Sequence, residues 1–344
     1  MTSEGRRDLR RLPKAHLHLH FTGAMRHGTL LDLAARHAIR LPDALLDPRP
    51  PRLSAADERG WFRFQRLYDI ARSVLRHPDD VRRLVHEVAE DEAADGSGWL
   101  EIQIDPSGYA ARFGGLTAFL ELVLAATEAA SRATGVGVGV VIGANRTRHP
   151  LDARTLARLA VAHAGRGVVG FGLANDERRG PPRDFDRAFR IAARADLLCV
   201  PHGGELLGAD SVRDCVDALG AHRVGHGVRA VEDPQVLELL AARGITCEVC
   251  PTSNVALGVY PDLAAVPLAQ LLAAGVPVAL GADDPLLFGA RLTWQYAAAR
   301  RHHGLDDAAL AELARTSVRA SRAPSDVRAR LLAGIDAWLE LNPG

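Results

Sequence analysis

The chain has 344 residues, 47% of them hydrophobic, and its 42 basic and 42 acidic side chains give a formal net charge of zero. Because the two signs of charge are interspersed, no single-sign field attracts nucleic acid or an anionic membrane, and we expect neither as a partner. No stretch approaches the roughly 20 apolar residues of a membrane span, and the first residues lack the apolar core of a signal peptide, so a cytoplasmic enzyme is expected.

Eight short apolar runs, rich in β-branched or small residues, predict buried strands. In chain order they cover residues 15–21, 99–104, 138–144, 168–174, 197–202, 222–227, 245–250 and 276–282. Amphipathic segments separate most of them. In the clearest one, Asp233 can cap a helix, Pro234 suits its first turn and Gly244 can end it. The alternation predicts a (β/α)8 barrel in one domain over residues 1–344, with a six-stranded doubly wound sheet as the alternative.

The segment between the first two strands, about residues 23–97, is far longer than one crossover helix. Its pattern is mostly helical. Insertions that follow a barrel strand lie at the catalytic mouth, so we expect a helical insertion that forms a lid or a wall of the substrate site.

Histidine and carboxylate side chains stand where predicted strands end. They are His18, His20, His202, His226, Asp283 and Asp284. The first two are two residues apart on a strand and therefore point to the same face. Barrel enzymes assemble their sites where strands meet the loops that follow, so this set predicts a mononuclear metal site.

Imidazoles with one carboxylate suit Zn²⁺ best, although Fe²⁺ or Mn²⁺ accepts similar ligands. A second ion bridged by a carboxylated lysine is not expected, because the only lysine, Lys14, precedes the first strand. Glu205, three residues after His202, can carry protons or order its own loop by hydrogen bonding. The residues alone leave open whether His226 is a ligand or an electrostatic helper.

Six sequence blocks resemble the signature motifs of the adenosine deaminase family. They are residues 14–23, 170–177, 201–205, 224–229, 248–254 and 281–285, in the family's order. The resemblance implies the same (β/α)8 barrel, one zinc ion, and hydrolytic deamination of a 6-aminopurine nucleoside as the small-molecule substrate. It implies that the zinc ligands are His18, His20, His202 and Asp283.

The resemblance also implies roles for the remaining residues. Glu205 would donate a proton to purine N1, His226 would stabilise the attacking oxygen, and Asp284 would hydrogen-bond that oxygen. A backbone N–H near Asn175 would meet purine N3. The family usually has glycine at this position, so Asn175 must either avoid positive φ or adopt the left-handed region that asparagine tolerates.

Thr22 is the sharper departure, because the family usually carries Asp or Glu there to hold the ribose 5′-hydroxyl. A neutral side chain would suit a substrate that lacks this hydroxyl or carries an anion nearby, since two carboxylates repel each other. In the second strand, the family's E-x-R becomes Glu101-Ile102-Gln103. The first block, with residues 57–69 and 281–289, is most similar to bacterial aminodeoxyfutalosine deaminases.

That similarity implies deamination of 6-amino-6-deoxyfutalosine to futalosine, a step of menaquinone biosynthesis. The alternative function is deamination of adenosine or deoxyadenosine. A more remote alternative is a barrel that binds a nucleoside without catalysis. The futalosine substrate ends in a benzoate, whose surroundings in the insertion would be Trp61, Phe62, Phe64 and Tyr68 with Arg63 and Arg66. Alternatively, these aromatic side chains only pack their helix on the barrel. The sequence predicts no oligomeric state.

Overall fold

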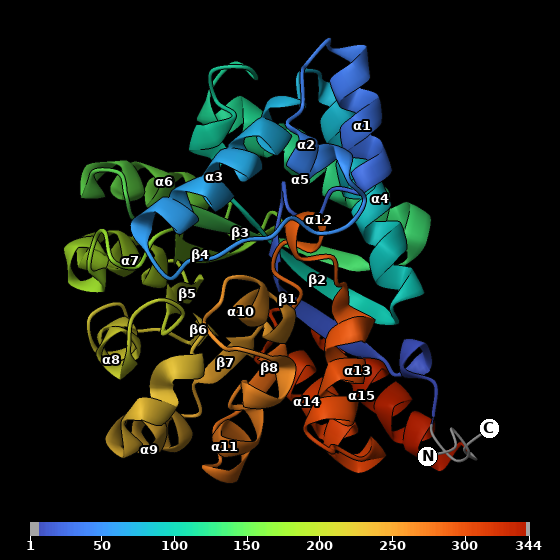
Figure 1. Cartoon of the computed structure of the whole chain (residues 1–344), viewed down its shortest axis with the longest axis vertical. Coiled ribbons are helices and arrows are strands. Elements are labelled where there is room, and N and C mark those ends of the chain that lie inside the picture. The colour runs from blue at the N-terminus through green and yellow to red at the C-terminus, as the bar shows by residue number, and fades with distance from the viewer. Residues whose placement is uncertain (1–6, 342–344) are drawn as a thin grey trace.

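The computed structural model describes residues 7–341, and eight parallel strands form its central sheet (Figure 1). The strands are β1 Lys14–His20, β2 Ser97–Ile104, β3 Gly137–Asn145, β4 Val168–Ala174, β5 Leu198–Gly203, β6 Arg223–His226, β7 Thr246–Val249 and β8 Val278–Leu280. All eight predicted strands are present, and their bounds differ from the prediction by no more than two residues.

The sheet closes on itself where the residues after β8 meet β1. The N–H of Asp283 donates to the carbonyl of His18 over 3.0 Å, and the N–H of His20 donates to the carbonyl of Asp283 over 2.9 Å. With the strands paired in chain order, the predicted (β/α)8 barrel is confirmed. The doubly wound sheet is excluded, because such a sheet keeps two open edges.

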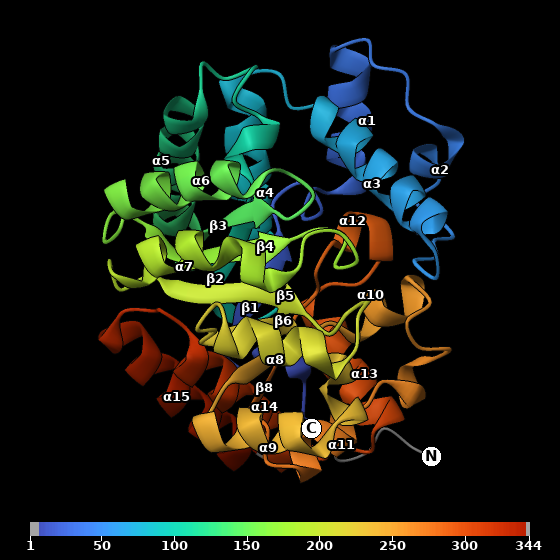
Figure 2. The same ribbon diagram turned by 90° about the vertical axis from the view of Figure 1, so that its left-hand side faces the viewer.

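Helices cover the outside of the barrel, as the two perpendicular views show (Figures 1 and 2). The helices that follow β2, including the short α12 at the centre of Figure 1, are α5 Leu116–Thr134, α6 Pro150–Ala162, α7 Asp186–Ala193, α8 Ala209–Asp217, α9 Pro234–Arg243, α10 Pro251–Ala256, α11 Leu268–Ala273, α12 Pro285–Phe288, α13 Leu292–His302, α14 Asp307–Ala320 and α15 Ser325–Glu340. The ends of α9 are those predicted: the Asp233 carboxylate accepts from the N–H of Gln235 over 2.8 Å, and Gly244 ends the helix with a φ of 64°. Within residues 7–341, no helix combines the length and hydropathy that crossing a membrane would need.

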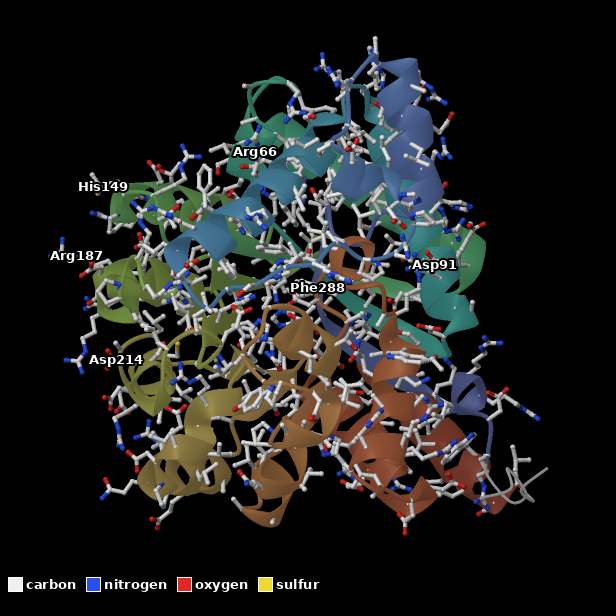
Figure 3. All side chains as sticks on the ribbon, viewed as in Figure 1. Arg66, Asp91, His149, Arg187, Asp214 and Phe288 are labelled. Carbon is white, nitrogen blue, oxygen red and sulfur yellow. The ribbon has the colours of Figure 1, made fainter. Side chains whose placement is uncertain are left out.

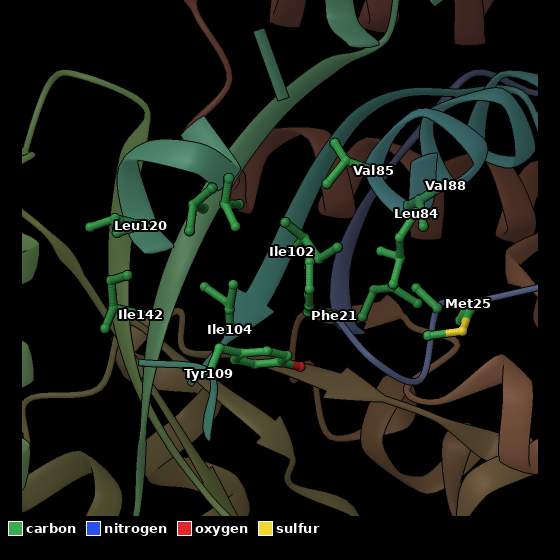
Figure 4. Close-up of a cluster of buried hydrophobic side chains, with 14 of the residues drawn as sticks. Phe21, Met25, Leu84, Val85, Val88, Ile102, Ile104, Tyr109, Leu120 and Ile142 are labelled. Atoms are coloured by element: carbon green, nitrogen blue, oxygen red, sulfur yellow. The ribbon is translucent and has the colours of Figure 1, made fainter. Parts of the chain in front are cut away.

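Four helices lie between β1 and β2: α1 His27–Arg36, α2 Asp43–Leu46, α3 Glu58–Ser73 and α4 Pro78–Ala94. The last of them packs on the barrel. Figure 4 shows Leu84, Val85 and Val88 of α4 on the same side as Ile102 of β2, and all four side chains belong to one buried cluster. Thus α4 occupies the place of an ordinary barrel helix.

Helix α3 lies over the ends of the strands instead. The ring of Phe64 on α3 stacks on the ring of Phe288 on α12, with centroids 5.6 Å apart and planes 15° from parallel. Phe288 is near the centre of the molecule in Figure 3, whereas Arg66 is on the outer side of α3. One face of α3 therefore covers the mouth of the barrel.

Candidate active site

Three histidines from opposite sides of the barrel meet at its mouth. His18 and His20 leave β1 on one face, and His202 comes from β5. The Nε2 atoms of His20 and His202 are 3.1 Å apart, and the rings of His18 and His202 have centroids 4.6 Å apart. The carboxylate of Asp283 adds an oxygen 3.3 Å from Nε2 of His20 and 3.7 Å from Nε2 of His18.

The donor set fits a divalent metal ion. His18 Nε2 is buried and has no hydrogen-bond partner in the described part of the chain. Burial lowers the pKa of His20 to about 4 and that of His202 well below its usual range, so both rings are neutral, which is the form that binds a cation. A spacing of 3.1 Å between two imidazole nitrogens is compatible with bonds of about 2.1 Å to one shared zinc ion. The site is therefore a possible metal site of the predicted composition.

Behind His18, a fully buried chain of charged side chains runs across the barrel. His18 Nδ1 is 2.8 Å from a carboxylate oxygen of Glu248, whose other oxygen accepts from Arg223 Nε over 2.6 Å. Arg223 also donates to Glu101. A carboxylate on Nδ1 fixes the proton there and turns the lone pair of Nε2 towards the metal. The role of Glu248 could not be predicted from the sequence, although Glu248 is the first residue of the block 248–254.

His16, the remaining histidine of β1, contacts residues next to the site but does not face the cavity. Its Nδ1 is 2.7 Å from Glu92 of α4, and its Nε2 accepts from the N–H of Ala282 over 3.0 Å. The second bond holds the chain immediately before Asp283. The hydroxyl of Ser253 in turn donates to the Asp283 carboxylate. His16 thus orients a metal-site residue without facing the site itself.

Glu205 and its loop depend on a second buried carboxylate, Glu177. The oxygens of Glu177 accept from the N–H groups of Gly204 and Glu205 over 2.8 Å each, from those of the next two residues, and from the hydroxyl of Ser211. Burial raises the pKa of Glu205 well above its usual range, and the charges of Asp283 and Glu177 add to the effect. The raised pKa favours the protonated form of Glu205.

His226 and Asp284 complete the polar groups around the metal site. His226 Nε2 is 3.6 Å from a Glu205 oxygen, and burial lowers its pKa to about 3, so the ring is neutral. Burial, with the neighbouring charges of Asp283 and Glu205, raises the pKa of Asp284 well above its usual range. One oxygen of Asp284 has no partner in the described chain. Both residues line the cavity at the mouth.

This cavity has a volume of about 80 Å³. The predicted residues that line it are His20, Asn175, His202, Glu205, His226, Asp283 and Asp284. Thr22 is not among them: its side chain is fully buried and its hydroxyl is bonded to the hydroxyl of Tyr109. Position 22 therefore presents no polar atom to a ligand in the cavity.

Asn175 adopts the left-handed backbone region, with φ of 86°, which is one of the two conformations considered for it. Its side-chain oxygen accepts from Trp61 Nε1 over 3.2 Å, and its amide donates to Gln65 over 3.0 Å. Both partners are on α3. The side chain of Asn175 thus fastens the helix over the mouth to the end of β4.

The side chains of α3 divide between cavity and solvent. Trp61, Phe64, Gln65 and Tyr68 line the cavity, whereas Phe62, Arg63 and Arg66 are exposed. The cation that reaches the cavity is Arg72, which sequence analysis did not single out. Its guanidinium lies over the rings of Tyr68 and Tyr109, with centroids 5.1 and 5.6 Å away.

The family model described as adenosine deaminase matches residues 13–338. The chain belongs to the adenosine deaminase family. It shares 67% of residues with a Streptomyces virginiae protein and 64% with one from Streptomyces coelicolor A3(2), both named "Putative adenosine/adenine deaminase", over 97% or more of each chain. As a member of this family, the protein is a hydrolytic deaminase.

Two further relatives differ in their named substrates. The aminodeoxyfutalosine deaminase of the same Streptomyces coelicolor strain is 36% identical over 95% of this chain and 86% of that protein. The crystal structure of an adenine deaminase from Arthrobacter aurescens superposes with a TM-score of 0.88 at 29% identity, covering 96% of this chain and 99% of that one. The family thus contains members named for the free base as well as for a substituted nucleoside.

Proposed function

We propose that the protein deaminates free adenine, giving hypoxanthine and ammonia. The observation that carries the proposal is the surroundings of Thr22. By the resemblance, an acidic side chain at this position would bind the ribose 5′-hydroxyl, yet Thr22 is neutral, fully buried and bonded to Tyr109 behind the cavity wall. A substrate without ribose needs no partner there.

The size of the cavity supports a compact substrate. Its volume of about 80 Å³ is well below the roughly 300–1,000 Å³ of pockets that hold drug-sized ligands. An adenine nucleoside extended by a benzoate is a ligand of that larger class. The cavity therefore favours a substrate smaller than this extended nucleoside.

The comparison within one bacterium points the same way. The chain is 64% identical to one Streptomyces coelicolor protein and 36% identical to the aminodeoxyfutalosine deaminase of the same strain. Deamination of aminodeoxyfutalosine, predicted from the sequence, is therefore the second candidate. Arg72 favours it, because a guanidinium at the cavity wall can pair with a carboxylate.

The residues divide the reaction among them. The protonated Glu205 can give its proton to purine N1 as water adds at C6, and the neutral His226 beside it can accept or share a proton on the attacking oxygen. A divalent ion held by the three histidines and Asp283 would supply an activated water at neutral pH, since zinc lowers the pKa of its bound water to about 7. The raised pKa of Asp284 favours its protonated form, which can donate a hydrogen bond to the attacking oxygen or to a ring nitrogen.

The test is ammonia release by the metal-loaded protein from adenine, adenosine and aminodeoxyfutalosine. We expect the highest kcat/KM with adenine. The highest value with adenosine would overturn the proposal, and the highest value with aminodeoxyfutalosine would establish the second candidate. In that last case Arg72→Gln should weaken turnover of the benzoate-bearing substrate and leave adenine turnover unchanged. No ammonia from any of the three would favour the non-catalytic alternative.

A further inference from the structure

The polar groups that act on the substrate come from the arc of the barrel that runs from β5 through β8 to β1. They come from β1, β5, β6 and the residues after β8, through His20, His202, Glu205, His226 and Asp284. A purine whose C6 and N1 face these groups turns its opposite edge, with N3 and N9, towards the wall built by β2, β3 and β4. The side chains of that wall meet the part of the substrate where free adenine and its nucleosides differ.

Gln103 is on this wall, at the end of β2, and lines the cavity. Its side chain is 2% exposed, and neither its amide oxygen nor its amide nitrogen has a hydrogen-bond partner within the described chain. Its main chain, by contrast, is held, since its carbonyl accepts from the N–H of Phe21 over 2.9 Å. A buried amide with both polar atoms unpaired is costly, so a partner from outside the protein is expected.

On the neighbouring part of β4, no side chain competes for this amide. A Cβ at Gly172 would lie 3.6 Å from Oε1 of Gln103, so glycine leaves the oxygen without a side-chain neighbour there. Gly143 of β3 lines the same cavity as Gln103. Asn175, farther along the same wall, already uses its own side chain to hold α3.

We infer that Gln103 is a specificity-determining residue that recognises the N3 and N9–H edge of free adenine; the inference rests on the proposed function. A primary amide offers an acceptor and a donor side by side. Free adenine offers the complement, a donor at N9–H and an acceptor at N3, so that Oε1 accepts from N9–H while Nε2 donates to N3, in place of the backbone N–H near Asn175 that the family resemblance implies. The 6-amino and N1 positions are left to Glu205 and the metal site.

The acceptor half of this pair discriminates against nucleosides. In adenosine, N9 carries a sugar carbon and has no hydrogen to donate, and that carbon would face Oε1. The Gln103 oxygen would then remain buried and unpaired in the complex. Glutamine in place of the family's arginine at this position also leaves the wall without a charge, as suits a neutral base.

The first test uses the unaltered, metal-loaded protein with adenine and 9-methyladenine, which differ only at N9. We expect kcat/KM to be roughly tenfold to a hundredfold higher for adenine, the discrimination typical of one paired hydrogen-bonding edge. Equal values would overturn the inference without any variant being made.

The second test repeats this comparison with Gln103→Met, which keeps the length of the side chain and removes both polar atoms. We expect the ratio of kcat/KM between adenine and 9-methyladenine to fall to about one, because the contact to N9–H is lost, while the loss of the donor to N3 affects both substrates alike. A preference that comes only from crowding at N9 would survive in this variant. Gln295→Met, at a buried glutamine on α13 outside the cavity, is the matched control and should keep the adenine preference.

Metal content and thermal unfolding show whether Gln103→Met has lost its fold. If it has, Gln103→Glu is used instead. This variant keeps an acceptor for N9–H and should retain part of the preference for adenine. An adenine preference that persists in every Gln103 variant overturns the role of Gln103 and leaves the proposed function standing. A wild type that prefers adenosine to adenine overturns the proposed function, and the Gln103 inference with it.

Discussion

At the scale of single residues, the site depends on uncommon backbone conformations. Asp283 and His226 both have φ of 63°, in the left-handed region that non-glycine residues adopt at a cost of roughly 1–3 kcal/mol. Each follows or ends a strand of the barrel. The backbone bonds between Asp283 and β1 hold one of them in place. The barrel's closure therefore stabilises a conformation that the local sequence does not favour.

Glu177 offers a test of positioning at this scale. Glu177→Gln replaces one acceptor oxygen with a donor that faces backbone N–H groups, so the loop of Glu205 must shift. We expect kcat to fall by up to about a hundredfold, because displacements near 1 Å cost that much. Metal content should be unchanged. Glu238→Gln, at an exposed carboxylate on α9, is the control, and an unaltered kcat in Glu177→Gln would contradict the role.

The sequence predicted the residues that converge at the mouth but not those that hold them. His18, His202 and Asp283 could be recognised because they stand at strand ends, where a barrel brings them together. Glu177 and Gln103 give no such signal. Their roles depend on which N–H groups or empty space they meet, and this follows from loop geometry rather than from residue spacing.

At the scale of elements, the link between β4 and α3 controls access to the cavity. Two hydrogen bonds from the Asn175 side chain hold Trp61 and Gln65 over the mouth. Periodicity alone showed that Trp61, Phe64 and Tyr68 can share a face of a helix. Periodicity did not show that this face meets the mouth of the barrel. The arginines considered as partners of a benzoate, Arg63 and Arg66, are exposed.

Asn175→Gly tests this link. Glycine suits a φ of 86°, so the backbone is not strained, and the variant loses the two bonds to α3 together with the local bond from the Asp176 N–H. At about 1 kcal/mol for each bond, we expect KM to rise roughly fivefold to thirtyfold, with a smaller change in kcat. Ala38→Gly, which relieves a φ of 52° on the surface, should leave KM unchanged. An equal KM in both variants would show that α3 does not depend on Asn175.

At the scale of the whole molecule, the base of the barrel is pinned by Lys14. The amine at the start of β1 donates to the carbonyl of Leu9 over 3.0 Å and to that of Asp95 over 2.6 Å, and it faces the ring of Tyr296. Its side chain is fully buried. Burial lowers the pKa of Lys14 from 10.5 to about 8, against the charges of Asp95 and Glu92.

This lowered pKa predicts a pH-dependent stability. Between about pH 8 and 10.5 the unfolded chain keeps the Lys14 proton that the folded protein has released, so the free energy of unfolding rises with pH. The gain reaches about 3 kcal/mol above pH 10.5 and is absent below pH 8. Denaturant unfolding of wild type and Lys14→Met over this range should give diverging curves. Parallel curves would mean that the amine is not desolvated.

The burial of Lys14 also leaves the folded barrel without a side-chain amine that amine-reactive reagents can reach. The sequence has a single side-chain amine, and in the native protein no solvent reaches it. Acylation of Lys14 can proceed only from molecules in which the base of the barrel has opened. The rate at which this one residue is acylated would therefore report how often the base of the barrel opens under native conditions.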